Sequence, residues 1–587
     1  MRIPSVVCCS IVAVMLIMTA VWLYISFLLT VQAETSVYTV FTLSPTSEDQ
    51  IDFLRNERLK NGMLDFWREP TRIGAPIHVM IKDAHISDFR NELNVRNITH
   101  EILIKNVEKL IKKLKDKAAT EGANVYSHAT KDVINFDFGR FHPYEDVVAY
   151  AQALATHFPD RVQIASIGKT HEGRDIPVLK IGTKGNQKKP AIWIDGGIHA
   201  REWISPAVVL FFVDQLVGAY STDPFIKKLV DSLDWYIVPL LNPDGYEFSR
   251  SSTDPVVRFW RKNRSPALCK PDTMECCEGV DLNRNFDWFF GAQGSSTDPC
   301  QDIYNGAEPF SEPETAAVRD FLLNVSDDLK SFLTFHSYAQ VLMFPYGHLS
   351  GTYPGDVTEL QSTAIRAANA LKSVYGTNYV VGTGADILYP ASGGSDDWVK
   401  GKLGIKYTYL FELRPQTSDA SGFLFDSSQI IPTALETWEA VKVIVERVLD
   451  QYGSGTESPA GNKGPDVIDA LDKMVHSEKE TLTNPKAQVE KTKEKIAAQK
   501  SALEMAAVQP PTIPLVGDTP TQPQLPDLGG TPLVPQNTDM NALFGQNMVG
   551  TVTKCLELLS VCSINQQGQD CRSLQIPCVN ILRQYFT

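Results

Sequence analysis

The chain has 587 residues, of which 43% are hydrophobic, and a formal net charge of −14 at pH 7. At ~100–200 residues per domain, this length predicts three or four structural units with ample material for a large core. The acidic charge balance argues against nucleic acid as the main partner.

The N-terminal segment has no charged residue between Arg2 and Glu34 and is apolar from Val6 to Val31. A helix that spans a bilayer needs ~20 residues, whereas the apolar core of a secretory signal peptide has ~7–15. Residues 31–33 resemble a small-residue cleavage site. We therefore expect residues 1–33 to be a signal peptide, with an uncleaved signal anchor as the alternative. Either one directs the chain into the secretory pathway.

Residues 34–120 have the pattern of a small α+β unit. Alternating apolar residues predict a strand over 36–43, and a helix is expected from Ser47 onward. The apolar run 77–81 predicts a second strand. Apolar residues at helical spacing, with lysines between them, predict a helix over 101–117.

Residues 136–452 have the pattern of one large α/β domain. The apolar runs 191–195, 235–241, 331–335 and 405–411 predict buried strands, and helices are expected over 203–220 and 433–452. Short apolar runs that alternate with helices predict a parallel or mixed sheet covered on both faces.

The chain changes character after Gly453, where Gly/Ser-rich, charged and Pro-rich stretches predict an extended linker. A module of fewer than ~40 residues needs covalent or metal staples to remain folded. Cysteines in an oxidising compartment favour disulfides, and zinc ligation is the alternative. The two cysteine clusters are Cys269, Cys276, Cys277 and Cys300, and Cys555, Cys562, Cys571 and Cys578.

Four side chains suited to zinc hydrolysis stand at or next to predicted strands. His199 and Glu202 are three residues apart, which lets both face the same way on a helical turn. His336 follows the strand predicted over 331–335, and Glu412 ends the strand predicted over 405–411. Ligands of open α/β sheets bind at the carboxyl ends of the strands. Two histidines and a glutamate suit a catalytic zinc, and a separate carboxylate can act as the base.

Ordered motifs over residues 36–452 resemble those of the pancreatic carboxypeptidase A/B family of zinc metallocarboxypeptidases. They are His199-Ala-Arg-Glu-Trp, Asn242-Pro-Asp-Gly-Tyr, Phe259-Trp-Arg-Lys, Gly279-Val-Asp-Leu-Asn-Arg-Asn, His336-Ser-Tyr, Tyr389-Pro-Ala-Ser-Gly-Gly-Ser-Asp-Asp-Trp and Phe411-Glu-Leu-Arg. The resemblance implies an α/β fold with a mixed eight-stranded sheet flanked by helices, preceded by a small α+β ferredoxin-like prodomain. The implied parts are an activation propeptide (34–120), an activation linker (121–135), a catalytic domain (136–452), a charged and Pro-rich linker (453–550) and a small cysteine-rich module (551–587).

The resemblance implies a single Zn²⁺ bound by His199, Glu202 and His336. Zinc in this position would polarise the scissile carbonyl and lower the pKa of its water. Glu412 would be the general base, and Arg261 would stabilise the oxyanion.

The resemblance also assigns residues around the zinc. Asp281 matches a carboxylate that orients a zinc-binding histidine. An arginine fork pairs with a carboxylate through two hydrogen bonds, which explains exopeptidase action, since an internal peptide bond offers no such anion. The implied substrate contacts are Asn283, Arg284 and Tyr389 to the terminal carboxylate, with Arg201 and Tyr338 as auxiliary contacts.

The resemblance indicates a preference for C-terminal Lys or Arg. Asp396 matches a pocket-floor position that is acidic in B-type members of the family, and Gly384 is also B-like, whereas Gly347 is A-like. A buried carboxylate strongly favours a cationic partner. The alternative is that Asp396 is satisfied within its own loop and the pocket is permissive.

The cysteines match the family only in part. Cys277 and Cys300 match its common disulfide, whereas Cys269 and Cys276 lie in a segment that departs from the family, which leaves an extra bridge open. The four C-terminal cysteines resemble toxin-like modules of some invertebrate secreted enzymes, although those modules usually have six. A matrix or surface partner for this module is the corresponding expectation.

The expected protein is a secreted, monomeric zymogen that an activating protease cleaves after a basic residue between about Lys112 and Arg140. Peptide C-termini are the expected substrate, and no nucleic-acid partner is expected. The alternatives are a catalytically silent extracellular matrix or binding protein and a membrane-anchored ectopeptidase. Asn97, Asn263 and Asn324 begin N-x-S/T sequences, the pattern of glycan acceptors.

Overall fold

The computed structural model describes residues 37–60, 64–120, 134–185, 188–270, 273–417, 419 and 421–453. The expected signal segment 1–33, the segment that follows Gly453 and the cysteine-rich module 551–587 lie outside these residues. The same is true of residues 121–133 of the expected activation linker.

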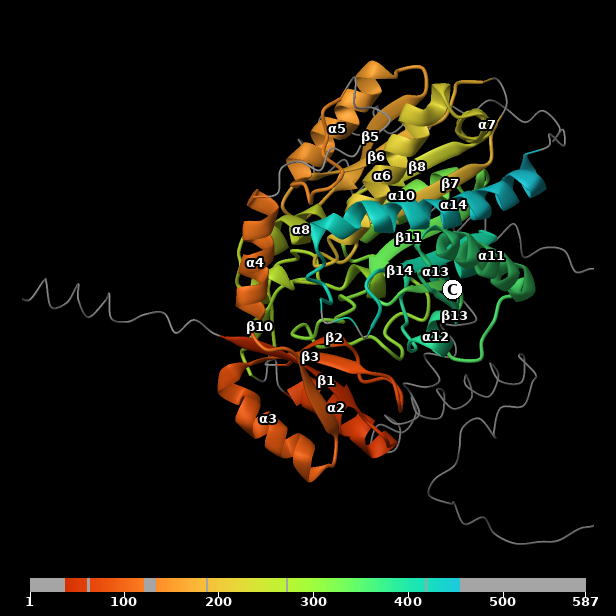
Figure 1. Ribbon diagram of the computed structural model, residues 1–587. Helices are drawn as coiled ribbons and strands as arrows, with labels where there is room; N and C mark the ends of the chain where they lie inside the picture. Colours follow the sequence, from red (N-terminus) through yellow and green to blue (C-terminus); the bar gives the residue numbers. More distant parts are fainter. Residues whose placement is uncertain are drawn as a thin grey trace, which may run out of the picture. The chain divides into compact units, whose positions relative to one another are not determined.

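The N-terminal part is a four-stranded antiparallel sheet with the strand order β2-β3-β1-β4 (Figure 1). Its strands are β1 (Tyr38–Ser44), β2 (Leu64–Arg68), β3 (Ile77–Lys82) and β4 (Thr99–Ile104), and its helices are α2 (Glu48–Lys60), α3 (Asp83–Val95) and α4 (Val107–Thr120). Phe41 and Leu43 pack into one cluster with α2 and α3, whereas Val40 packs into another on the opposite face. This alternation is the two-residue period of a strand, and it confirms the α+β prodomain.

The helix expected over 101–117 is wrong for its first residues. Residues 101–104 belong to β4, where Ile102 pairs with Phe41 and Ile104 pairs with Val40. The helix begins only after Asn106, whose Oδ1 accepts a hydrogen bond from the backbone N–H of Lys109 at 2.7 Å. A partner strand therefore overrode the helical spacing, and an asparagine cap set the start of the helix.

The large domain is built on an eight-stranded mixed sheet, as expected. In order across the sheet, its strands are β13 (Val380–Thr383), β12 (Val341–Phe344), β14 (Tyr407–Leu413), β11 (Leu329–Ser337), β7 (Ala191–Gly196), β8 (Asp234–Val238), β6 (Asp175–Ile181) and β5 (Val162–Lys169). The central strands β14, β11, β7 and β8 are mutually parallel, while β5, β6 and β12 each form an antiparallel pair.

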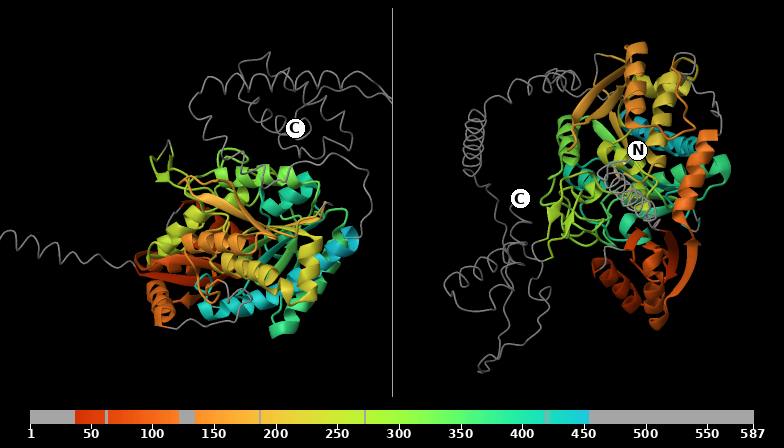
Figure 2. Two further views of the ribbon diagram at one scale, coloured as in Figure 1. Left: turned by 90° about the horizontal axis from the view of Figure 1, so that it is seen from above. Right: turned by 90° about the vertical axis from the view of Figure 1, so that its left-hand side faces the viewer.

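Helices cover both faces of this sheet (Figures 1 and 2). They are α5 (Tyr144–His157), α6 (Ile204–Gly218), α7 (Pro224–Ser232), α8 (Pro243–Arg250), α9 (Pro255–Arg258), α10 (Pro313–Val325), α11 (Val357–Tyr375), α12 (Gly384–Ile387), α13 (Ser395–Leu403) and α14 (Ile430–Tyr452). Short 3-10 turns lie at Ala219–Ser221, Leu282–Arg284 and Ser427–Gln429.

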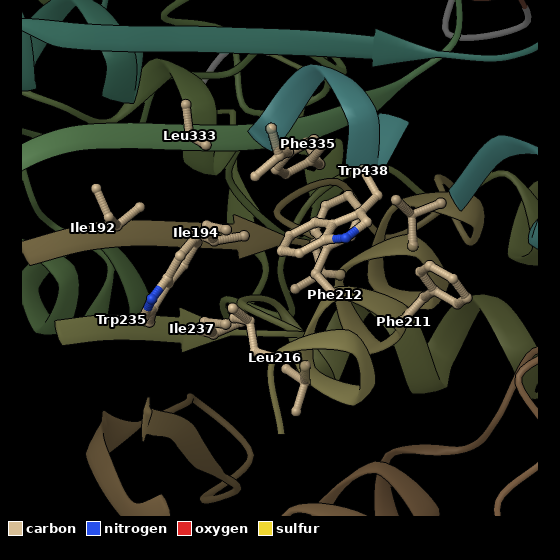
Figure 3. Packing of buried hydrophobic residues seen from close by; sticks show 14 of the residues in the cluster. Ile192, Ile194, Phe211, Phe212, Leu216, Trp235, Ile237, Leu333, Phe335 and Trp438 are labelled. Carbon is tan, nitrogen blue, oxygen red and sulfur yellow. The ribbon is translucent and has the colours of Figure 1, made fainter. Parts of the chain in front are cut away.

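The core on one face is formed by α6 and α14 against the central strands. Figure 3 shows Ile192 and Ile194 of β7 on the same side as Phe212 of α6 and Trp438 of α14. Trp193, between the two isoleucines, faces the other core, which includes α10. Both faces of the central strands are buried, which explains their continuous apolar sequences.

One helix of the described part has the length and apolar composition of a membrane span. It covers Ile204–Ser221, and 72% of that window is buried inside the protein. This burial identifies it as a core helix of the large domain.

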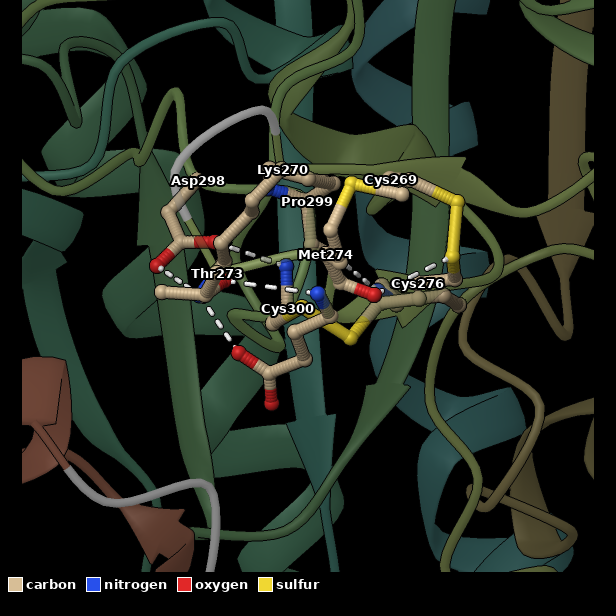
Figure 4. Close-up of a disulfide and its surroundings, with 11 residues drawn as sticks. Cys269, Lys270, Thr273, Met274, Cys276, Asp298, Pro299 and Cys300 are labelled. Atoms are coloured by element: carbon tan, nitrogen blue, oxygen red, sulfur yellow. Dashed lines mark hydrogen bonds and ion pairs between the residues drawn. A yellow bond between two sulfur atoms is a disulfide. The ribbon is translucent and has the colours of Figure 1, made fainter.

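Two disulfides lie close together beside the sheet (Figure 4). Cys277 bonds to Cys300, as the resemblance implied. Cys269 bonds to Cys276, which are directly opposite each other in the hairpin formed by β9 (Leu268–Cys269) and β10 (Cys276–Cys277). The bridge that the sequence left open is therefore present.

The three N-x-S/T sequences differ in their accessibility. Asn97 and Asn324 are exposed, whereas Asn263 is completely buried. The Asn263 amide donates hydrogen bonds to Glu312 and Glu314. The expectation of a glycan at Asn263 is therefore wrong for the folded chain, because a glycan needs solvent access that this side chain lacks.

Candidate active site

Three side chains with metal-binding atoms meet at the carboxyl ends of β7 and β11. His199 lies in the loop after β7 and Glu202 lies just before α6, while His336 is the last residue but one of β11. β7 and β11 are parallel neighbours, so their ends reach the same edge of the sheet. One ligand atom from each of the three residues lies within 4.8 Å of the other two, and all three residues are buried.

The hydrogen bonds of the two imidazoles use Nε2 and leave Nδ1 of each ring for a cation. Nε2 of His199 lies 3.1 Å from Oδ1 of Asp281, and Nε2 of His336 lies 3.2 Å from Oγ1 of Thr334. The Thr334 hydroxyl donates to Asp195, so it accepts from His336. Both rings therefore carry their proton on Nε2, and their Nδ1 atoms face each other at 3.2 Å.

Two unprotonated nitrogens at this distance repel each other unless a cation lies with them. Glu202 completes the arrangement, since its Oε1 lies 2.9 Å from Nδ1 of His199 and its Oε2 lies 3.4 Å from Nδ1 of His336. Two imidazoles and one carboxylate are the ligand set of a catalytic zinc with an open position. The three residues therefore fit Zn²⁺.

Asp281 links the zinc-binding group to Arg261. One carboxylate oxygen of Asp281 faces His199, and the other accepts from Nε and Nη2 of Arg261 at 3.0 and 2.9 Å. Burial by itself would raise the pKa of Asp281. The charges of Arg261, Arg284 and His199 outweigh burial and hold this pKa well below its usual range. Nη1 of Arg261 lies 3.8 Å from Glu202, so the guanidinium is fixed beside the metal ligands.

Glu412 lies on β14, directly opposite His336 in the parallel pairing of β11 and β14. Both strands continue past their expected C-terminal ends, so His336 and Glu412 each lie within a strand. Burial, together with the nearby Glu202 carboxylate, raises the pKa of Glu412 to about 7. A carboxylate with a raised pKa suits a group that accepts and returns a proton near neutral pH.

Asn283 and Arg284 lie in one short turn whose other contacts orient them. Oδ1 of Asn283 accepts from the Ser395 backbone N–H at 2.9 Å, which leaves its amide group to donate elsewhere. Nε of Arg284 donates to the Gly294 carbonyl at 2.8 Å, and Nη1 donates to the Asn283 carbonyl. Tyr389 is partly exposed in the loop before α13.

Asp396 lies in the first turn of α13 with only 9% of its surface exposed. Burial, reinforced by the neighbouring Asp397, raises the pKa of Asp396 to about 7. Asp397 is satisfied by the Gly347 and His348 backbone N–H groups. Within the described ranges, neither Lys nor Arg forms an ion pair with Asp396.

Two glycines lie against each other next to this region. A Cβ placed on Gly384 would be 3.5 Å from the Cα of Gly347. The absence of a side chain at both positions therefore preserves space that larger residues would fill.

The prodomain engages two of the residues expected to contact substrate. Asp65 accepts from Nη1 of Arg201 at 3.0 Å, and the Phe66 carbonyl lies 3.4 Å from its Nη2. Nδ1 of His78 hydrogen-bonds with the hydroxyl of Tyr338 at 2.7 Å. The prodomain therefore occupies hydrogen-bonding groups of both Arg201 and Tyr338.

Aromatic packing reinforces this contact. The Trp67 ring lies 4.4 Å from the ring of Phe259 and 5.5 Å from that of Phe423. The Arg201 guanidinium stacks over Phe423 at 4.5 Å, so the cation and the aromatic rings form one interface. Such a buried aromatic anchor is typical of the residues that dominate the energy of an interface.

Acidification is expected to weaken the prodomain through His78. Burial, together with Arg68, lowers the pKa of His78 to about 3 from an ordinary value of 6.5. Neutral His78 therefore contributes its full stability above pH 6.5, and this contribution is lost progressively as the pH falls toward 3. The groups that face His78 are Arg68, its partner on β2, and Tyr338. Between pH 7 and pH 5 the loss is about 2 kcal/mol.

Denaturant unfolding of the zymogen at both pH values, compared with His78→Gln, measures this effect. Burial raises the pKa of Asp65 to about 7, so acidification stabilises the folded zymogen through Asp65. This effect is present in both proteins, and the difference in stability between them therefore isolates His78. The stability of the wild type relative to His78→Gln should fall between pH 7 and pH 5. An unchanged difference would contradict the assignment of a neutral, buried His78.

The sequence did not single out Asp65, His78 or Phe423 as site residues, although it placed Asp65-Phe66-Trp67 in the propeptide. The two-residue period of β2 and β3 was the available signal, because it puts Trp67 and His78 on the face opposite the prodomain core. The partner surface that they cover comes from distant parts of the chain. Thr334 and Asp195, which orient His336, were also not singled out.

Comparison with known proteins gives a consistent family. Residues 147–440 match the family model described as zinc carboxypeptidase, and residues 41–113 match the one described as carboxypeptidase activation peptide. Carboxypeptidase A2 of Mus musculus is 40% identical over 412 residues, which cover 70% of this chain and 94% of that protein. Carboxypeptidase B of Astacus astacus is 42% identical over 316 residues, 54% of this chain and 99% of that protein.

Solved structures agree with the sequence comparison. The crystal structure of thrombin activatable fibrinolysis inhibitor has a TM-score of 0.62 at 33% identity and covers 71% of this chain and 99% of its own. This coverage extends over both the prodomain and the large domain of this chain.

Proposed function

The chain belongs to the zinc carboxypeptidase family and carries the family's activation peptide, and from this premise we propose a secreted carboxypeptidase specific for C-terminal Lys and Arg. It is a metallocarboxypeptidase made as a zymogen with one zinc. The observation that supports the specificity is Asp396, a buried carboxylate without a Lys or Arg ion pair among the described residues. A substrate ammonium or guanidinium group supplies the missing cation.

The residues divide the reaction between them. When bound to His199, Glu202 and His336, zinc supplies a Lewis acid that polarises the scissile carbonyl. Glu412 takes a proton from the attacking water and delivers it to the leaving amine. The Arg261 guanidinium, held by Asp281 at 2.9 Å, stabilises the negative charge that develops on the carbonyl oxygen.

Substrate is oriented by its terminal carboxylate. Arg284 is fixed by the Gly294 carbonyl and Asn283 by the Ser395 N–H, so both are preorganised donors for this anion. Tyr389 adds a phenol from a partly exposed loop. An internal peptide bond lacks this anion, so the enzyme removes one residue at a time from the C-terminus.

The zymogen becomes active when the prodomain leaves. Removal of Asp65 and His78 frees Arg201 and Tyr338 for substrate. We place the activating cleavage after a basic residue between about Lys112 and Arg140. Two disulfides in the described part support an oxidising, secretory location, as does the apolar N-terminal segment.

The test is hydrolysis of two matched peptides, ending in Arg and in Phe, by the protease-treated full chain with and without a zinc chelator. Chelator-sensitive release of Arg but not Phe is the expected result. Release of Phe in place of Arg would retain the enzyme and overturn the specificity. Release of neither residue from matured, zinc-loaded protein would favour the catalytically silent alternative.

A further inference from the structure

A second group of metal-binding side chains lies outside the catalytic centre. It joins His171, in the turn between β5 and β6, to Glu312 and Glu314 at the start of α10. One ligand atom from each residue lies within 4.8 Å of the other two. This group shares no residue with His199, Glu202 and His336, and it has no role in the reaction described above.

The two carboxylates of this group are held close together. The Asn263 amide nitrogen donates to Oε2 of Glu312 at 2.8 Å and to Oε2 of Glu314 at 3.0 Å. Nε2 of His171 lies 2.9 Å from the same Glu312 oxygen, and the Ser311 hydroxyl donates to the other. Glu312 therefore has a partner on each oxygen.

Glu314 is different, and this difference points to a missing cation. It is completely buried, and its Oε1 is shielded from solvent without a hydrogen-bond partner among the described residues. A buried carboxylate oxygen without a partner is costly, and proteins normally compensate it with a donor or a metal ion. Here it belongs to a cluster in which two carboxylates share one amide group.

Two simpler explanations leave the oxygen unsatisfied. Glu314 lies in the first turn of α10, where the helix dipole favours negative charge, but the dipole gives its Oε1 no hydrogen-bond donor. Burial raises the pKa of Glu314 to about 7, so it can be protonated, yet a buried O–H then also needs an acceptor. A cation next to Glu314 supplies the partner that its Oε1 lacks.

We propose that His171, Glu312 and Glu314 bind a divalent transition-metal cation of the Zn²⁺ type. An imidazole together with carboxylates is a ligand set of zinc and related metals, whereas Ca²⁺ and Mg²⁺ prefer oxygen ligands throughout. The His171 side chain is 25% exposed, which gives an ion access from solvent, while the glutamates lie behind it. The site joins the β5–β6 turn to α10 and, through Asn263, to the segment that carries Arg261.

The experiment counts zinc on the full-length zymogen after equilibrium dialysis against buffered Zn²⁺, for wild type, His171→Ala, Glu314→Gln and His157→Ala. The partly exposed His171 allows substitution with little risk to folding, which keeps the test informative if Glu314→Gln fails to fold. His157 is the matched control, because it is an exposed histidine that bonds to the Ala153 carbonyl and belongs to none of the metal-binding groups of the described residues. A thermal melt of each protein, with zinc and with calcium, is the second measurement.

Wild type and His157→Ala should bind one zinc per chain more than His171→Ala and Glu314→Gln. Their melting temperatures should rise with zinc at concentrations beyond those that fill the catalytic centre, and this rise should be absent from the other two variants. Equal zinc content in wild type and His171→Ala would overturn the proposal. Stabilisation by calcium but not by zinc would overturn the assignment to a transition metal.

Discussion

Replacing Glu412 with Gln should lower kcat/KM of the activated enzyme by at least about 10²-fold, within the 10²–10⁴-fold range of general acid–base catalysis. Glutamine is close to glutamate in size but cannot accept and return the proton. Because Glu412 is opposite His336 on the neighbouring strand and is not one of the grouped zinc ligands, zinc content should remain unchanged. Steady-state kinetics and zinc analysis on the same preparation check both parts.

A matched variant separates catalysis from general damage. Glu439→Gln makes the same chemical change on α14, where the carboxylate pairs with Lys442 and is 39% exposed. It should retain wild-type kcat/KM. If Glu412→Gln retained more than a tenth of the activity, or lost its zinc, the role of Glu412 as proton acceptor would be wrong.

Replacing Asp396 with Ser should reverse the side-chain preference. Removing one partner of a buried ion pair costs about 3–5 kcal/mol, which corresponds to a loss of about 10²-fold to 4 × 10³-fold in kcat/KM for a peptide that ends in Arg. A peptide that ends in Phe should be cleaved as well as before or better, since the pocket no longer contains a charge. The ratio of kcat/KM for the two peptides measures the effect without reference to enzyme concentration.

The control for this experiment is Asp287→Asn, which removes an acidic group of the surface that is 50% exposed and pairs with Lys402. Its Arg/Phe ratio should equal that of the wild type. A parallel loss of activity toward both peptides in Asp396→Ser would indicate structural damage to α13. An unchanged ratio would show that Asp396 is satisfied within its own loop and that the pocket is permissive.

Local residue patterns predicted some of the helices and strands of the prodomain and failed for others. The spacing of apolar residues predicted β1 and α2, and a continuous apolar run predicted β3, whose two faces are both buried. Residues 101–104 have helical spacing but form β4, since pairing with β1 outweighs local preference. The edge strand β13 and its neighbour β12 have four residues each and were not predicted, because such short segments carry too little pattern.

The sequence predicted the catalytic residues more completely than it predicted the residues that surround them. His199 and Glu202 are near neighbours in sequence, and the motifs around Arg261, Glu412 and His336 were sufficient to indicate zinc peptidase chemistry. Strand pairing alone decided that His336 lies opposite Glu412, and the tautomers of the two histidines depend on Asp281 and Thr334 from other elements.

The sequence by itself determined the chemistry of this protein, since reactive groups occur in short motifs whose residue types can be read directly. The tertiary structure decided how those groups are covered and which others they meet. It placed Asp65 and His78 over the expected substrate contacts, buried the Asn263 of an otherwise ordinary N-x-S/T sequence, and brought His171 to Glu314. The physical reason is that burial and long-range contacts arise from packing between distant segments, and local residue patterns do not encode such partners.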